Sequence, residues 1–110
     1  MSITRKPWGH ELLWALTANY AAKILYINQG HRLSLQLHEQ KEETIYVLRG
    51  TMYLHIGNDG NVIVLLPGQT YHIAPRTIHR MEARDTDVEV VEVSTPQLYD
   101  VVRIEDDYGR

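Results

Sequence analysis

A ten-residue stretch of the chain, SLQLHEQKEE at residues 34–43, places polar side chains where a small protein needs apolar ones. Gln36 and His38 lie two residues apart within an apolar run, and Glu43 opens the next run. Side chains alternate across a strand, so Arg32, Gln36 and His38 share one face. An amide, an imidazole and a carboxylate can together bind a divalent metal ion. The solvated side of an antiparallel sheet would give the same pattern, so both interpretations stay open at this point.

Further features of the sequence favour the metal site. Four residues separate His38 from Glu43, which is enough for a turn that returns the carboxylate to the imidazole. Glycines flank this block on both sides, at positions 30 and 50. A second block, GQTYHIAPRTIHRME at residues 68–82, adds His79 at the start of a predicted strand, after a turn that contains proline. The candidate ligands are Gln36, His38, Glu43 and His79.

The elements that must position these groups are short runs rich in β-branched residues. We predict nine strands, at residues 23–27, 33–37, 44–48, 51–56, 62–66, 71–73, 79–83, 88–93 and 101–104. Turn signals such as Asn58-Asp59-Gly60 and Pro67-Gly68 separate them. The longest helical periodicity covers only residues 11–16. The sequence therefore predicts an all-β sandwich or barrel, and its 110 residues fit a single domain over positions 1–110.

Composition argues against several classes of function. A net charge of −3 gives no support for nucleic acid or a membrane surface as partner, since both require a basic patch. The longest apolar stretch, residues 62–66, is far too short to span a bilayer. The N-terminal residues lack the apolar run of a signal peptide, and the chain has no cysteine for disulfides or thiolate metal sites. We expect a cytoplasmic protein.

The two blocks resemble a known family. Residues 30–50 resemble the first cupin motif, with Gln36 where many cupins carry a histidine, and residues 68–79 resemble the second. Residues 6–14, 30–50 and 100–110 are similar, more specifically, to the type II phosphomannose isomerase cupin. That domain often follows a mannose-1-phosphate guanylyltransferase domain and also occurs alone. The resemblance implies a jelly-roll barrel, also called a double-stranded β-helix. Arg76, in place of a turn glycine, is among the departures.

The resemblance implies one divalent metal ion held by Gln36, His38, Glu43 and His79. Zn²⁺ is the first expectation, and Mn²⁺, Co²⁺, Ni²⁺ or Fe²⁺ would also suit these ligands. The implied activity is the interconversion of mannose 6-phosphate and fructose 6-phosphate. That reaction removes a weakly acidic proton and forms an enediolate, whose developing charge a divalent cation stabilises.

The remaining roles have weaker candidates. Lys23, His72 and Glu82 could each serve as the base that moves a proton between C1 and C2, and a metal-bound water is another possibility. Arg32 and Arg103 are the candidates for binding the substrate phosphate, since guanidinium groups match phosphate geometry. For every one of these side chains, an ordinary solvated or half-buried place in a strand is an alternative.

Two other functions remain open from the sequence. The first is a non-catalytic module whose metal-containing barrel holds a sugar or a sugar nucleotide. The second is an iron or manganese oxygenase of the cupin type, which Gln36 disfavours because such centres are usually richer in histidine. We also expect a homodimer that pairs edge strands, and a tail at residues 104–110 that is ordered near the barrel.

Overall fold

The computed structural model describes residues 2–110, which form eleven β-strands and no helix. The strands are β1 (Ser2–Lys6), β2 (Gly9–Leu16), β3 (Ala21–Ile27), β4 (Leu35–Leu37), β5 (Glu43–Arg49), β6 (Met52–Ile56), β7 (Asn61–Leu65), β8 (Thr70–Ile73), β9 (His79–Ala83), β10 (Val88–Ser94) and β11 (Val102–Glu105). The all-β prediction is therefore confirmed. Each of the nine predicted strands corresponds to one of these, from β3 to β11.

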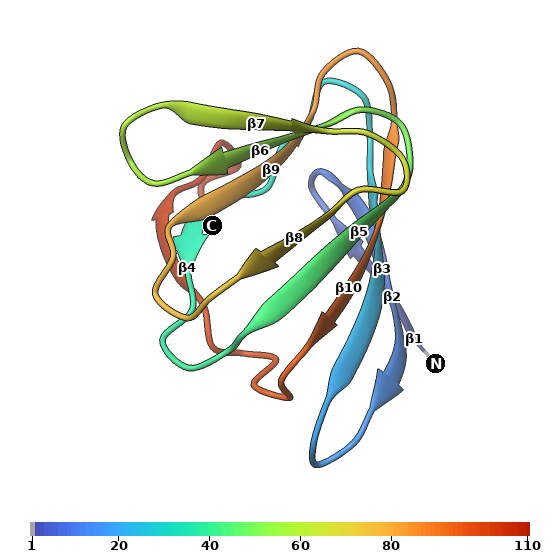
Figure 1. Cartoon of the computed structure of the whole chain (residues 1–110), viewed down its shortest axis with the longest axis vertical. Coiled ribbons are helices and arrows are strands. Elements are labelled where there is room, and N and C mark those ends of the chain that lie inside the picture. The colour runs from blue at the N-terminus through green and yellow to red at the C-terminus, as the bar shows by residue number, and fades with distance from the viewer. Residues whose placement is uncertain (1) are drawn as a thin grey trace.

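The strands form two antiparallel sheets that face each other (Figure 1). One sheet has six strands in the order β1-β2-β3-β10-β5-β8, and the other has five in the order β11-β4-β9-β6-β7. The hairpin of β1 and β2 is absent from the predicted set. Residues 11–16, the stretch with the most helical pattern, belong to β2 because they pair with β3 across a bulge between Leu13 and Ala15.

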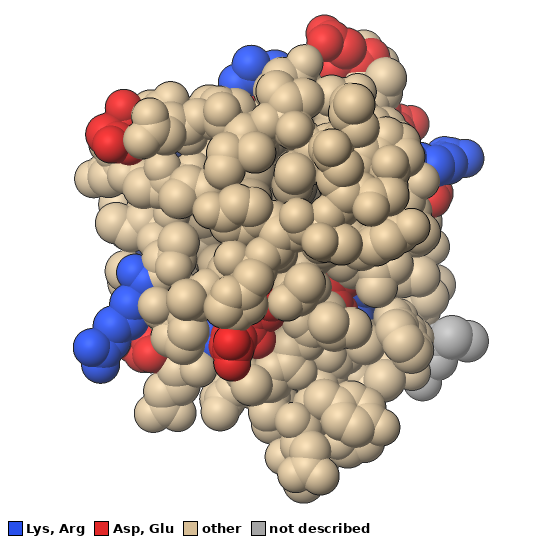
Figure 2. All heavy atoms as spheres, in the orientation of Figure 1, with Lys and Arg blue, Asp and Glu red and all other residues tan. Residues whose placement is uncertain are grey.

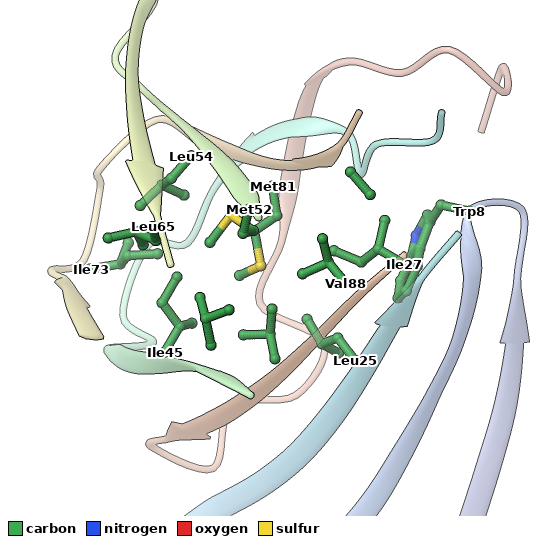
Figure 3. Close-up of a cluster of buried hydrophobic side chains, with 13 residues drawn as sticks. Trp8, Leu25, Ile27, Ile45, Met52, Leu54, Leu65, Ile73, Met81 and Val88 are labelled. Carbon is green, nitrogen blue, oxygen red and sulfur yellow. The ribbon is translucent and has the colours of Figure 1, made fainter. Parts of the chain in front are cut away.

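The inner faces of the two sheets enclose a hydrophobic core (Figure 3). Strand alternation sends every second side chain inward, so Ile45 and Val47 of β5 and Leu54 of β6 are completely buried. Trp8, in the turn between β1 and β2, closes one end of the core and is only 3% exposed. Each large apolar side chain buried in this way contributes roughly 1.5–3 kcal/mol to folding.

At one end of the molecule, the same inward-facing positions become polar. On β10, the inward series begins with Val88 and Val90 and continues with Glu92, which is also buried. Glu43 lies at the start of β5 and His79 at the start of β9, and both are buried. The apolar part of the sandwich therefore supports a buried polar cluster at its end.

The C-terminal tail lies against its own barrel. Strand β11 pairs with β4, and the tail beyond it is held by side-chain contacts. The Arg32 guanidinium binds the Asp107 carboxylate, with its Nε 2.6 Å from Oδ2, and His31 contacts the Tyr108 hydroxyl. Arg80, which is 3% exposed, donates from Nη1 to Oε1 of Glu105 at 3.2 Å. The tail is therefore ordered by contacts within one chain.

Charged groups are mixed over the surface. On the face shown in Figure 2, acidic and basic side chains lie mainly at the margins and do not form one basic patch. This distribution matches the net charge of −3. Among residues 2–110, no helix has the length and apolar character required to cross a membrane.

Candidate metal centre

Three side chains from separate parts of the chain converge at the polar end of the core. Nε2 of His38 and Nε2 of His79 each lie 3.2 Å from Oε1 of Glu43. One ligand atom from each residue lies within 4.8 Å of the other two, a spacing suited to a shared metal ion. His38 follows β4, whereas Glu43 and His79 begin β5 and β9, so both sheets contribute. All three side chains are buried.

Main-chain carbonyls orient both imidazole rings. Nδ1 of His38 donates to the carbonyl oxygen of Asp100 at 2.6 Å, and Nδ1 of His79 donates to that of Thr77 at 2.8 Å. A carbonyl oxygen can only accept, so Nδ1 of each ring carries a proton, and Nε2 of each ring is directed at Glu43. Metal-binding histidines in proteins are commonly fixed in this way.

Unsatisfied buried atoms provide a test of whether a metal ion fits. Within residues 2–110, Oε2 of Glu43 and Nε2 of His79 are buried and lack hydrogen-bond partners. Buried polar atoms without partners cost free energy and are rare in folded proteins. Two imidazole lone pairs and a carboxylate that converge in this way would be satisfied together by one divalent cation. The residues present therefore fit a divalent metal ion.

Gln36 lies beside these three residues. It is directly opposite His79 in the pairing of β4 with β9, so the two side chains lie on the same face. Its Oε1 accepts a hydrogen bond from the Ser34 hydroxyl at 2.7 Å, which holds the amide in place. An amide oxygen, two imidazoles and one carboxylate form a donor set that suits Zn²⁺ and several other divalent ions.

Two further charged side chains extend the cluster inside the barrel. Nζ of Lys41 lies 3.1 Å from Oε2 of Glu92 and 3.8 Å from Oε2 of Glu43. Burial and the Glu43 charge raise the pKa of Glu92 to about 8, although Lys41 acts in the opposite direction. Burial would also raise the pKa of Glu43, but His38, His79 and Lys41 hold it well below the usual value. Glu43 is therefore the ionised carboxylate of the cluster.

An open pocket with a volume of about 100 Å³ adjoins the cluster. Gln36 and His38 belong to its lining, so the metal centre is reached from this pocket. The other charged groups of the lining are five cationic side chains and two carboxylates, namely Lys6, Lys23, Lys41, Arg103, Arg110, Glu11 and Glu92. Because the cationic side chains outnumber the acidic ones, the pocket favours an anionic ligand.

The structure brings one of the three candidate bases into the pocket. Lys23 lines it, with Nζ 3.1 Å from Oε1 of Glu11. His72 lies on the surface, half exposed, and contacts Glu42. Glu82 lies outside the pocket lining and contacts His55, with 2.8 Å between Oε1 and Nε2. Lys23 is therefore the base candidate that lies near the metal centre.

The two candidate phosphate ligands also occupy different places. Arg103 lines the pocket and lies directly opposite Gln36 in the pairing of β11 with β4. The Arg32 guanidinium lies outside the lining and makes two hydrogen bonds to Asp107, at 2.6 and 2.9 Å. Arg110, in the same pocket as Arg103, is held by Asp106 through Nε at 2.9 Å. Arg103 is therefore the arginine of the pocket that is available to a ligand.

Sequence reasoning missed several charged residues of the pocket. Glu92 follows Val88 and Val90 at spacings of two, so alternation alone could have identified it as a polar group on a core face. Glu11 gave no such signal, because β2 was not recognised as a strand. Lys41 lies in the turn between β4 and β5, where sequence gives no direction for a side chain.

Asp100 organises the loop that carries His38. Its carboxylate accepts hydrogen bonds from the backbone N–H groups of Glu39, Gln40 and Lys41, and these bonds lower its pKa. We therefore expect Asp100→Ala to weaken Zn²⁺ binding by ~10- to 100-fold, as loss of an outer-shell partner does. Calorimetric titration would measure this effect.

The matched control for this prediction is Asp59→Ala, which alters an exposed acid in the turn between β6 and β7. It should leave Zn²⁺ affinity unchanged. Equal affinity in the Asp100→Ala variant and the unaltered protein would contradict the role given to Asp100.

Comparison with known proteins agrees with this fold. A family model described as "Cupin domain" matches residues 24–94, so the chain belongs to the cupin family. Within that family, the chain is 29% identical over 109 residues to the alginate biosynthesis protein AlgA of Pseudomonas putida. It is also 29% identical to the xanthan biosynthesis protein XanB of Xanthomonas campestris and to the mannose-1-phosphate guanylyltransferase ManC of Salmonella typhimurium. Each match covers 96% of this chain and only 22–23% of the relative.

Solved structures support the fold. KdgF from Halomonas sp. superimposes with a TM-score of 0.76 at 20% identity, over 88% of this chain and 87% of that one. An RmlC-like cupin from Shewanella frigidimarina gives 0.78 at 18% identity, over 90% and 86% of the two chains. At these identities the likeness establishes the double-stranded β-helix architecture and nothing about activity.

Proposed function

We propose that the chain is a metal-dependent sugar-phosphate isomerase that interconverts mannose 6-phosphate and fructose 6-phosphate. The observation that carries this proposal is the convergence of His38, Glu43 and His79 beside a pocket with an excess of cationic side chains. A divalent cation beside an anion-binding pocket suits a phosphorylated sugar, whose two ends would contact the two parts of the site.

The names of the relatives support a sugar ligand. Two are polysaccharide biosynthesis proteins and one is a mannose-1-phosphate guanylyltransferase. The chain spans about a fifth of their length, and their whole-protein activities are therefore only a guide to substrate class. A mannose-derived phosphate is consistent with both the names and the charges of the pocket.

In this proposal the residues of the centre and its pocket have different roles. Gln36, His38, Glu43 and His79 would hold the ion, which would supply Lewis-acid stabilisation of negative charge on the substrate oxygens. Lys23 lies in the pocket with its Nζ 3.1 Å from Oε1 of Glu11. As the neutral amine, after passing its proton to that carboxylate, it is our candidate for moving the proton between C1 and C2. The buried position of the centre limits competing contact with water.

Arg103 is our candidate for binding the phosphate. Its guanidinium makes no ion pair with the other residues between 2 and 110, whereas Arg32 is already held by Asp107. We expect Arg103→Gln to raise KM for mannose 6-phosphate by ~10-fold or more, since it removes a charge-assisted contact, with a smaller effect on metal content. Steady-state kinetics of the Zn²⁺-loaded protein would measure the change.

Arg32→Gln is the matched control for Arg103→Gln. It removes an arginine of the neighbouring segment that lies outside the pocket lining, and KM should change little. A larger KM effect from Arg32→Gln than from Arg103→Gln would reverse the assignment of the phosphate ligand.

The proposed activity can be tested with a coupled assay. Protein stripped of metal and reloaded separately with Zn²⁺, Mn²⁺ or Co²⁺ would be given mannose 6-phosphate, and formation of fructose 6-phosphate would be followed. At least one loaded form should turn over while the stripped protein does not. The main rival is a non-catalytic sugar-binding module, which the small share of the relatives' length favours. Saturable sugar-phosphate binding without turnover by any metal form would support that rival.

A further inference from the structure

The pocket beside the metal centre is built from two parts of the chain. The cupin model matches residues 24–94, and this region supplies Gln36 and His38 to the pocket lining. Five charged residues of the lining come from the segments on either side of it, namely Lys6, Glu11, Lys23, Arg103 and Arg110. We call these five residues the flanking charges. Because they lie outside the matched region, the flanking segments add a charged wall to the cupin core.

Four of the flanking charges belong to close ion pairs. Nζ of Lys23 lies 3.1 Å from Oε1 of Glu11, and this pair has no net charge whether or not a proton passes from the amine to the carboxylate. Asp106 accepts two hydrogen bonds from the Arg110 guanidinium, at 2.9 and 3.4 Å. These pairs leave Lys6 and Arg103 as the flanking charges that can balance the charge of a ligand.

Lys6 is held only loosely by its neighbour. Its Nζ lies 3.9 Å from Oε1 of Glu11, and Lys23 approaches the same oxygen to 3.1 Å. A distance of 3.9 Å is too long for a hydrogen bond, so the Lys6 ammonium keeps its capacity to donate to a ligand. The side chain is 27% exposed, whereas the four preceding residues of β1 are fully on the surface. Lys6 is therefore the residue of β1 that turns toward the pocket.

The turn between β1 and β2 fixes the place of Lys6. Trp8 is 3% exposed at one end of the core, and its carbonyl oxygen accepts a hydrogen bond from the Asn28 N–H at 2.9 Å (Figure 3). Gly9 has φ +153°, and a Cβ at this position would lie 1.9 Å from the carbonyl oxygen of Tyr26. Only glycine therefore allows this close approach of β2 to β3. Lys6 pairs directly with Gly9, so a rigid turn presents its side chain.

We propose that Lys6 binds the phosphate group of the ligand together with Arg103, an inference that rests on the proposed sugar-phosphate function. Lys6 belongs to the six-stranded sheet and Arg103 to the five-stranded sheet, so the phosphate would be held between the two sheets. A phosphate monoester carries a charge of about −1.5 to −2 at pH 7 and presents three acceptor oxygens. Two cations without a close carboxylate partner match that charge. The sugar oxygens would then face the metal centre.

Calorimetric titration of the Zn²⁺-loaded full chain with mannose 6-phosphate tests the role of Lys6. Lys6→Gln should weaken binding by ~10-fold or more, because it removes a charge-assisted contact. Lys6→Arg keeps the charge and should retain most of the affinity. Mannose, which lacks the phosphate, should bind equally to the Lys6→Gln variant and to the unaltered protein. Zn²⁺ affinity should be the same in all three proteins.

Arg5→Gln is the matched control, because Arg5 is the exposed neighbour of Lys6 on β1 and lies outside the pocket lining. It should bind mannose 6-phosphate as the unaltered protein does. Unchanged affinity in Lys6→Gln, or an equal loss in Arg5→Gln, would overturn the assignment. An equal loss of mannose binding would also overturn it, since the hairpin would then have only a structural role.

Binding and turnover separate this inference from the proposed function. A protein that binds mannose 6-phosphate through Lys6 but shows no turnover would support the phosphate-binding role and contradict the isomerase. Turnover with an unchanged KM in Lys6→Gln would support the isomerase and overturn the role of Lys6. An unaltered protein that binds no mannose 6-phosphate would overturn both.

Discussion

Replacing His79 by alanine is expected to release the metal ion. His79 contributes one of the three converging ligand atoms and is 1% exposed, so no solvent-facing residue can take its place without rearrangement. Removal of a direct ligand should weaken Zn²⁺ binding by at least ~100-fold, more than loss of an outer-shell partner does. The proposed isomerase activity should fall to background with it. Metal content after dialysis and calorimetric titration would measure the first effect.

His72→Ala is the control for this experiment, because His72 is a half-exposed histidine that lies outside the cluster. It should retain metal and activity. Glu43→Gln offers a second variant of the centre with nearly unchanged shape, and it should lose metal as His79→Ala does. Full metal content in both the His79→Ala and the Glu43→Gln variants would contradict the assigned ligand set.

A second large effect is expected in the metal-free protein as the pH is raised. The pKa of Glu92 is about 8 in the folded chain against an ordinary value of 4.5. Its stabilising contribution is complete below pH 4.5 and is lost as the pH rises toward 8. The free energy of unfolding should therefore fall by a few kcal/mol between pH 5 and pH 8, since one pKa unit corresponds to about 1.4 kcal/mol. Denaturant unfolding at several pH values would measure it.

Glu43 makes the stability of the metal-free protein rise with pH in a lower pH range, which is opposite to the effect of Glu92. Its pKa lies well below 4.5, so its stabilising contribution is present above that value and is lost on further acidification. Maximum stability of the metal-free protein is therefore expected near pH 5. Zn²⁺ at ~1,000 times its dissociation constant should restore about 4 kcal/mol at pH 8.

Two glutamate variants on β10 test whether Glu92 causes the fall in the free energy of unfolding between pH 5 and pH 8. Glu92→Gln removes the buried titrating group and should flatten the profile between pH 5 and pH 8. Glu89→Gln changes a residue on the outward face of the same strand, which pairs with Arg49, and should keep the slope. A metal-free protein whose stability is constant or rises over this interval would contradict the assignment.

The fold could largely be predicted from strand and turn patterns. Alternation and turn residues such as Asn58-Asp59-Gly60, between β6 and β7, locate the strands from β3 to β11. The hairpin of β1 and β2 was missed for a physical reason. Strand β1 is exposed along nearly its whole length, so it has no inward-facing apolar series, and β2 is defined by its pairing with β3. The local sequence therefore gives no pattern from which either β1 or β2 could be predicted.

The candidate site could also be predicted only in part from the sequence. Gln36 and His38 stand out because polar residues occupy alternating positions in an apolar run. Glu43 follows from the turn after His38, His79 follows from the second block, and the resemblance to cupins joins the four in one ligand set. The residues that hold these side chains in position reach them through contacts between distant parts of the chain. Asp100 holds a loop about 60 positions earlier in the chain. Such partners are determined by the packing of the two sheets, which no single stretch of sequence specifies.

The measurement that tests the central proposal most directly is an NMR time course in D₂O. Protein loaded with Zn²⁺, Mn²⁺ or Co²⁺ would be incubated with fructose 6-phosphate, with His79→Ala as the control. The proposed isomerase should produce mannose 6-phosphate that carries deuterium at C2, since the proton exchanges with solvent during enediolate formation. If no metal form gives product or exchange while sugar phosphate still binds, the isomerase proposal is contradicted and the chain is a binding module.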